Sequence, residues 1–345
     1  MMDKCKNCGG GLEFSPKNKG NKCVNCGTVY EIAFETGFSK KDVAENTIKL
    51  DLKNSELSQG KCSSCGGSVI FGRRGLKAEC PYCGSATLLV EKRAETMNVD
   101  SIVPFNYSKE EAIVKFKEVV NKNFFADKRI FNNITDNDIK GIYINAFVFD
   151  FTTSTNYHGV FSYQTTVKDK NGRTETKTIR KVVSGTFNKN FDNITIEANS
   201  NLTQYDLRSI EPFNYDSAVK YSDDFMHGYL LEYQDTMFED CIEIAKNSMK
   251  TKIKQELLKK HGCTRIESLD MSTTYPSQKY NYCLLPVYFV NTQNYKNGEK
   301  HRALMNGQTG KVGNLPLNKL KVWLTVLFAC GITVAIIIAV LLFVI

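Results

Sequence analysis

Several residue types and motifs are scarce in this chain of 345 residues, and each scarcity excludes a class of protein. With only 7 Pro and 23 Gly, the chain is neither collagen-like nor a Pro/Gly-rich disordered polymer. The 4 His lie far from the cysteine pairs and no Glu-x-x-His pair occurs, which argues against a di-iron carboxylate site. The Gly-x4-Gly-Lys-Ser/Thr spacing of a phosphate-binding loop is missing. No nucleophile and base stand together either, so we expect a protein that is not an enzyme.

The N-terminus also lacks the features of a secretory signal peptide, because the first four residues lead directly into Cys5. We therefore expect this end of the chain to lie in the cytoplasm, where thiols stay reduced and bind metal more often than they form disulfides. Of the 12 Cys, eight form four C-x2-C pairs in the first quarter of the chain. The four others are scattered, at Cys241, Cys263, Cys283 and Cys330.

The four C-x2-C pairs form two tetrads with identical spacing. The residues between the second and third cysteines number 14 in both, from Cys8 to Cys23 and from Cys65 to Cys80. A C-x2-C turn directs two sulfurs at one ion, and the following Gly can adopt the left-handed conformation that frees amides for the sulfurs. Four thiolates leave no open coordination position, so we predict two structural zinc ions per chain. The predicted ligands are Cys5, Cys8, Cys23, Cys26, Cys62, Cys65, Cys80 and Cys83.

Two other interpretations of the tetrads stay open. The segment from Cys80 to Gly84 is similar to a rubredoxin knuckle, which makes iron the alternative to zinc. The formal net charge of +8 suggests nucleic-acid binding, with phosphate contacts from the ribbon cations. Eight thiolates and two divalent ions would lower that charge to about +4, so we expect nucleic acid to be an unfavoured partner. The cations in question are Lys17, Lys19, Lys22, Arg73, Arg74 and Lys77.

The last 24 residues, 322–345, carry no charge. As a helix they would span about 36 Å, enough to cross a hydrocarbon core of about 30 Å. Lys319 and Lys321 precede this run and favour a cytoplasmic body. The pattern therefore predicts a C-terminal transmembrane anchor over 320–345, with the protein in the cell membrane as a single-pass, tail-anchored chain. Small residues recur every four positions and predict homotypic or heterotypic helix packing in the membrane, at Gly331, Ala335 and Ala339.

The rest of the pattern predicts an α+β fold. Helices are expected from about Ser108 and over about 235–261, and antiparallel strands between them and after the second helix. The segment 101–107 recurs as 209–215, which predicts two related halves. The expected division is zinc ribbon 1 at 1–30, a linker at 31–61, zinc ribbon 2 at 62–90, an α+β body at 101–316 and the anchor.

In this order the features resemble a family of bacterial membrane-anchored double zinc-ribbon proteins, sometimes labelled transcription-factor-IIB-type or primosomal helicase-like. Beyond the tetrads, five segments carry the resemblance: Ile102–Phe105, Gly141–Tyr143, Glu211–Phe213, Leu285–Tyr288 and Asn306–Lys311. The chain departs from the family at Asn145, Ala146 and Phe147, where relatives often have Pro and Trp. The resemblance implies no helicase activity. It implies a scaffold at the cytoplasmic face of the lipid bilayer that docks partner proteins, among them phage-shock-type or flotillin-like proteins.

Overall fold

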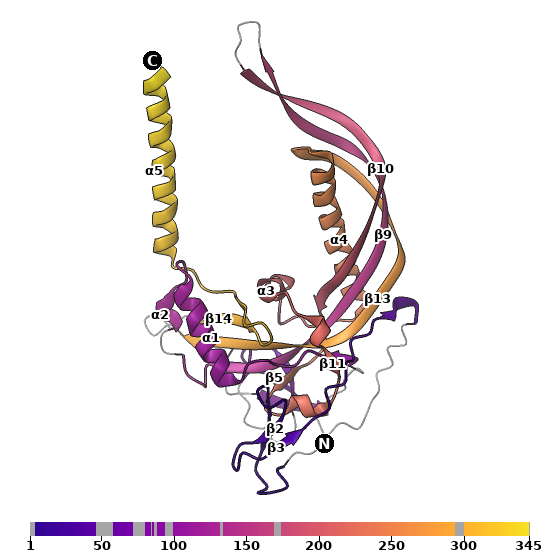
Figure 1. Cartoon of the computed structure of the whole chain (residues 1–345), viewed down its shortest axis with the longest axis vertical. Coiled ribbons are helices and arrows are strands. Elements are labelled where there is room, and N and C mark those ends of the chain that lie inside the picture. Colours follow the sequence, from indigo (N-terminus) through magenta and orange to yellow (C-terminus); the bar gives the residue numbers. More distant parts are fainter. Residues whose placement is uncertain are drawn as a thin grey trace.

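The computed structural model describes residues 4–45, 58–71, 80–83, 85, 88–93, 99–131, 134–168, 174–293 and 300–344. Most of the body is one mixed sheet of 12 strands. A separate three-stranded antiparallel sheet precedes it, formed by β1 (Leu12–Ser15), β2 (Gly20–Cys23) and β3 (Val29–Glu31). In Figure 1 this small sheet lies at the lower end of the molecule, near the N-terminus.

Three unusually long strands dominate the large sheet: β9 (Ile139–Lys168), β10 (Thr174–Glu197) and β13 (Arg265–Gln293). β13 and β10 pair antiparallel with opposite edges of β9. Together they curve into an arm that rises from the body (Figure 1). The other strands are β4 (Lys41–Asp42), β5 (Ser58–Cys62), β6 (Ser68–Phe71), β7 (Leu88–Arg93), β8 (Ser101–Ile102), β11 (Val219–Lys220), β12 (Leu230–Glu232), β14 (Lys300–Asn306) and β15 (Val312–Gly313).

The burial pattern of β9 divides the large sheet into two parts, a base that is covered on both faces and the arm, which is covered on one face. Residues 142–149 are buried without interruption, as expected where both faces are covered. From Phe151 to Phe161 buried positions recur at every second residue, because one face is covered and the other meets solvent. The covering element is helix α4 (Phe238–His261), which packs on the arm through the predicted apolar stripe, Phe238, Cys241, Ile242, Ala245, Met249, Ile253 and Leu257.

The remaining helices are α1 (Lys109–Lys122), α2 (Lys128–Phe131), α3 (Gln204–Ile210) and α5 (Lys319–Val344). The predicted capping box of α1 is present: Glu111 N–H donates to the Ser108 hydroxyl, and the Glu111 carboxylate accepts from Ser108 N–H at 2.8 Å. α4 ends at Gly262, whose φ of 56° is left-handed. Both helices therefore begin or end where the local sequence predicts.

The predicted fold class is wrong in two respects, the share of the body that is sheet and the division of the body into two related halves. Most described residues outside the helices belong to one continuous sheet, not to two α+β halves. The segment 101–107 begins as strand β8, between β11 and β13. The similar segment 209–215 instead includes the last two residues of α3 and contains no strand. Segments 101–107 and 209–215 have similar sequences without belonging to two related halves, and both contact the same turn.

That turn is Asn306–Lys311. The Asn306 amide donates to the carbonyls of Ile210 and Pro212, and the Asn106 amide donates to the Gln308 carbonyl at 3.0 Å. The Gln308 side chain accepts from Asn214 N–H at 2.7 Å and donates to the Asn214 carbonyl at 2.8 Å. The turn therefore connects the two Pro-Phe-Asn segments, and its role in this structure is architectural.

Gly307→Ala tests how tightly this turn is packed. A Cβ at Gly307 would lie 2.3 Å from Phe105 Cδ1 and 3.0 Å from Pro286 Cβ. Overpacking of this kind costs about 1–3 kcal/mol, which we expect urea denaturation to detect. Gly331→Ala is the matched control, since a Cβ there meets nothing within 4 Å, and Ala stabilises a helix by up to about 1 kcal/mol. Equal midpoints for the two variants would contradict the packing argument.

The prediction of a transmembrane anchor is also wrong. Within the part of the chain that the structure describes, no helix is long and apolar enough to cross a membrane. The predicted single-pass location in the cell membrane therefore has no support.

Candidate metal centres

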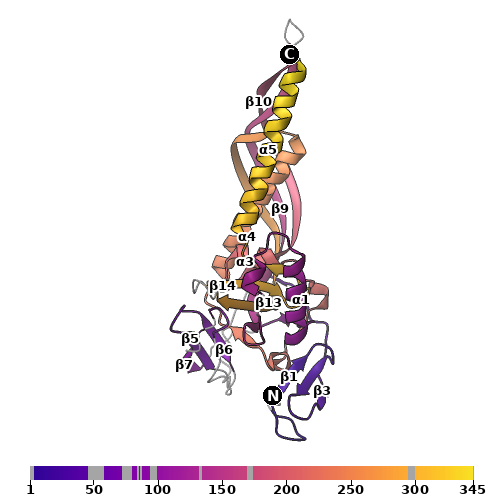
Figure 2. The ribbon, with the colours of Figure 1, turned by 90° about the vertical axis from the view of Figure 1, so that its left-hand side faces the viewer.

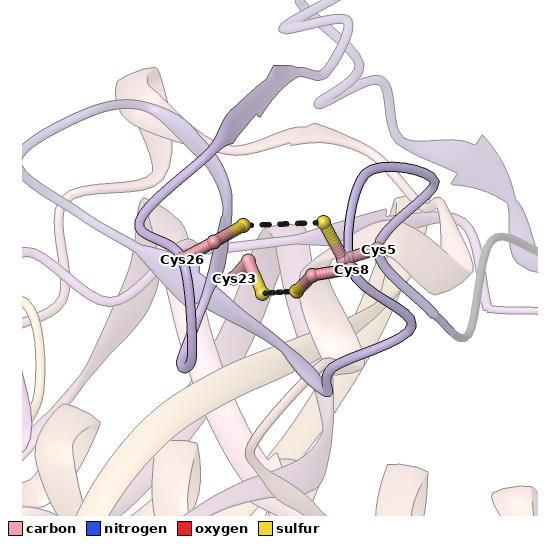
Figure 3. A group of neighbouring side chains, drawn as sticks. All are labelled: Cys5, Cys8, Cys23 and Cys26. Atoms are coloured by element: carbon pink, nitrogen blue, oxygen red, sulfur yellow. Dashed lines mark hydrogen bonds between the residues drawn. The ribbon is translucent and has the colours of Figure 1, made fainter.

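The first tetrad lies at one end of the small sheet (Figure 3). The Cys5–Cys8 turn precedes β1, and the Cys23–Cys26 turn connects β2 to β3. The Sγ atoms of Cys5 and Cys26 are 3.5 Å apart, as are those of Cys8 and Cys23. All four sulfurs lie within 4.8 Å of one another. The structure therefore brings the four predicted ligands together.

The second tetrad repeats this geometry. Cys62 and Cys83 Sγ are 3.6 Å apart, and Cys65 and Cys80 Sγ are also 3.6 Å apart. These distances far exceed the about 2.05 Å of a disulfide. A tetrahedral zinc site with Zn–S bonds of about 2.3 Å places its sulfurs about 3.8 Å apart. Each tetrad can therefore hold a metal ion such as zinc, and the sulfur-only donor set fits iron as well.

Backbone geometry prepares the sulfurs for a metal. Gly9, Gly27 and Gly66 have φ of 70°, 75° and 77°, the left-handed region that Gly adopts without strain. Hydrogen bonds from the Thr28 hydroxyl and amide lower the pKa of Cys26 to about 6. Burial opposes ionisation of Cys62, but amide hydrogen bonds from Cys65 and Ser64 outweigh it and lower its pKa to about 7. The thiolate, the form that binds metal, is thereby favoured at Cys26 and Cys62, whereas burial raises the pKa of Cys65 and Cys80.

The two tetrads differ in their surroundings. The first belongs to the small sheet, which contacts the body mainly through Phe14, buried beside Phe225 with ring centroids 5.3 Å apart. The second belongs to the large sheet, because β6 pairs with β12 and β12 pairs with β9. Figure 2 shows β5, β6 and β7 beside the body. The second metal site is therefore part of the main fold.

Tyr82, between Cys80 and Cys83, anchors the second site to the core. Its ring packs edge-on against Phe289 with centroids 5.4 Å apart, and its hydroxyl donates to Glu232 Oε1 at 2.7 Å. The preceding Pro81 carbonyl accepts from the Asn291 amide at 2.6 Å. The equivalent turn of the first site is instead open to solvent, and the Val24 side chain is 56% exposed.

A buried pair of carboxyl groups, Glu232 and Glu197, lies behind Tyr82. Glu232 is completely buried and its Oε2 accepts from Asn145 N–H at 3.4 Å. Burial raises the pKa of Glu232 to about 7. Burial and the neighbouring Glu232 raise the pKa of Glu197 well above its usual range. Sequence reasoning missed this pair, because residues 35 positions apart become neighbours only through the pairing of β9 with both β10 and β12.

The structure describes only some of the other predicted site residues. Lys17, Lys19 and Lys22 are exposed on the first ribbon, whereas Arg73, Arg74 and Lys77 lie outside the described residues. Gly331 lies on α5, and the side chains of Ala335 and Ala339 are outside the described part, so the predicted helix packing is untested. Within the described residues, no other group of three or more His, Cys, Asp or Glu side chains can hold a metal ion.

Comparison with known proteins leaves the family open. The chain matches no protein-family model and no solved structure. It is similar to an uncharacterised protein of Bacillus subtilis (strain 168), YdjG, with 24% identity over 325 residues, which cover 92% of this chain and 91% of YdjG. This similarity extends along almost the whole length of both proteins but supplies no function. The two cysteine tetrads are thus the features that define this protein's class, a chain with two zinc-ribbon-like sites.

Proposed function

We propose that this protein is a non-enzymatic adaptor, with two structural zinc ions, that docks partner proteins through its first ribbon. The observation that carries the proposal is the contrast between the two Cys-x-x-Cys turns that connect strands. The second turn is buried against the body through Pro81 and Tyr82. The first has the same sulfur arrangement but presents Val24 to solvent. A ribbon turn of this shape is suited to packing against a protein surface.

Zinc is the metal we propose, because four sulfurs complete its tetrahedral shell and leave no position for a substrate or water. Its role would be to fold a ribbon too small to be stable alone. The resemblance to double zinc-ribbon proteins suggests phage-shock-type or flotillin-like proteins as the first partners to look for. Iron would instead give the purified protein strong visible absorbance, so a spectrum and a metal assay separate the two.

The experiment is a crosslinking pull-down with the full-length chain from the cells that produce it. We expect Val24→Glu and the double variant Cys5→Ser/Cys8→Ser to recover at least about tenfold less of the wild-type partners, because a charge or an unfolded turn removes an apolar contact. Val114→Glu is the matched control, since Val114 is 69% exposed and lies on α1, outside the ribbon. Partners that persist with both ribbon variants, or recovery of nucleic acid in their place, would refute the proposal.

A further inference from the structure

The far end of the arm is a two-stranded hairpin with little support. β13 begins at Arg265, which pairs with Ser162, so β9 has no third strand beyond that point among the described residues. Helix α4 ends nearby at His261. Residues 163–168 of β9 and 174–179 of β10 therefore project beyond the third strand of the arm (Figure 1). Together with residues 180–182 of β10, they are here called the hairpin end. A hairpin of two strands is at best marginally stable in water.

The hairpin end is exposed and partly apolar. Val182 is 69% exposed, Ile179 43% and Val167 40%. In addition, β10 pairs only with β9 within the described chain, so no strand covers its other edge, and residues 174–182 at the hairpin end are exposed. A free edge of this length is a template for another strand, and proteins protect such edges with charge.

The arm around the hairpin end is strongly basic. Within the described residues of 162–189 and 250–268, eleven Lys and Arg stand against three acids, Glu175, Glu256 and Glu267. The resulting formal charge of +8 equals that of the whole chain. Some of these cations are paired, as Arg180 is with Glu267 at 2.9 Å, but Lys168 and Lys181 are exposed. Like charges oppose pairing with a second copy of this chain.

We propose that the free edge of β10 at the hairpin end binds an extended acidic segment of a partner protein by strand addition. Main-chain hydrogen bonds to the edge would supply affinity, and alternating side chains would meet the lysines and the apolar positions. A nucleic acid would satisfy the charge but would use neither the free strand edge nor the exposed Val and Ile side chains, and an anionic lipid surface would leave the free strand edge unused. This inference rests on the proposed adaptor function and assigns it a second docking surface.

The test uses the zinc-loaded full-length chain and a fluorescein-labelled 12-residue peptide that alternates Glu with Thr and Val. We expect binding that weakens as salt rises, because the charges are at the surface. The triple variant Lys168→Glu/Lys177→Glu/Lys181→Glu should weaken it about tenfold or more. The control triple Lys122→Glu/Lys220→Glu/Lys300→Glu, on exposed lysines elsewhere, should change it less than about twofold. Circular dichroism would verify that both variants fold.

A second peptide, with N-methyl groups at alternate amides, separates strand addition from charge alone. It keeps every carboxylate but cannot complete the ladder, so we expect about tenfold weaker binding. Equal binding of the two peptides, equal effects of the two triple variants, or no binding at low salt would overturn the proposal. Displacement of the peptide by duplex DNA or phosphatidylglycerol vesicles at lower concentration would also overturn it. The Val24→Glu pull-down reports on the first ribbon separately, so the two proposals can fail independently.

Discussion

The double variant Cys62→Ser/Cys65→Ser is expected to lose most of the folded body as well as one metal ion. Structural zinc contributes on the order of 10 kcal/mol of apparent binding free energy, similar to the total stability of about 5–15 kcal/mol of an ordinary domain. The second site is continuous with the large sheet through β6 and β12, and Tyr82 fills the core beside Phe289. Loss of the metal would therefore also remove the packing of Tyr82 and β6 against the core of the body.

Cys5→Ser/Cys8→Ser is the informative comparison, because the first site belongs to a separate sheet. We expect hydrogen exchange in that variant to rise over residues 4–31 while β9 and β13 stay protected. In the Cys62→Ser/Cys65→Ser variant, exchange should rise in β5, β6, β12 and the adjoining part of β9. Cys263→Ser, a thiol outside both tetrads, controls for the loss of a sulfhydryl. An unchanged thermal transition of the body in the second-site variant would contradict the integration described above.

The second large effect is a fall in stability as pH rises from about 4.5 to about 7, caused by the buried pair Glu197 and Glu232. Both have a pKa raised in the folded state, Glu232 from 4.5 to about 7. The folded state therefore keeps protons that the unfolded state has released, and each retained proton lowers stability by about 1.4 kcal/mol per pH unit. For Glu232 the cost reaches about 3 kcal/mol at pH 7 and above.

Charged groups near Glu197 and Glu232 also bear on the direction in which their pKa values shift. Asp206 and Asp235 disfavour ionisation of the pair, whereas Arg302 favours it but also lies 3.9 Å from Asp206. The lowered pKa of Cys26 has the opposite sign, because a thiol that ionises more easily in the folded state adds stability as pH rises above about 6. The measurements should therefore be made with zinc-saturated protein at constant free zinc, where the sulfurs are metal-bound and do not titrate.

Glu197→Gln tests the assignment. The amide has the same shape and can donate to the Glu232 carboxylate without retaining a titratable proton. We expect this variant to be more stable than the wild type at pH 8, because the buried charge of Glu197 and its repulsion of Glu232 are removed, and to lose part of the pH dependence in urea denaturation. Glu243→Gln, at an exposed position on α4, should leave both unchanged. A Glu197→Gln variant with the same pH dependence as the wild type would exclude the pair as its source.

The sequence by itself determined the two cysteine tetrads and the two principal helices, because these depend on local spacing. Cys-x-x-Cys turns place two sulfurs together in any fold that completes a tetrad, and all eight predicted ligands converge. The stripe of α4 and the capping box of α1 follow from a period of 3.6 residues and from contacts within one turn. Neither depends on the rest of the chain.

Only the tertiary structure decided the long sheet, the place of the second ribbon and the buried acidic pair. Strand pairing brings together residues that are far apart in the chain. The Glu232 carboxylate, for example, accepts a hydrogen bond from the Tyr82 hydroxyl 150 positions away, and no local sequence pattern predicts such a partner. The apolar run 322–345 was predicted as a membrane span from its composition, whereas no helix among the described residues is long and apolar enough to cross a membrane. The free edge of β10 likewise became visible only when its one partner, β9, was known.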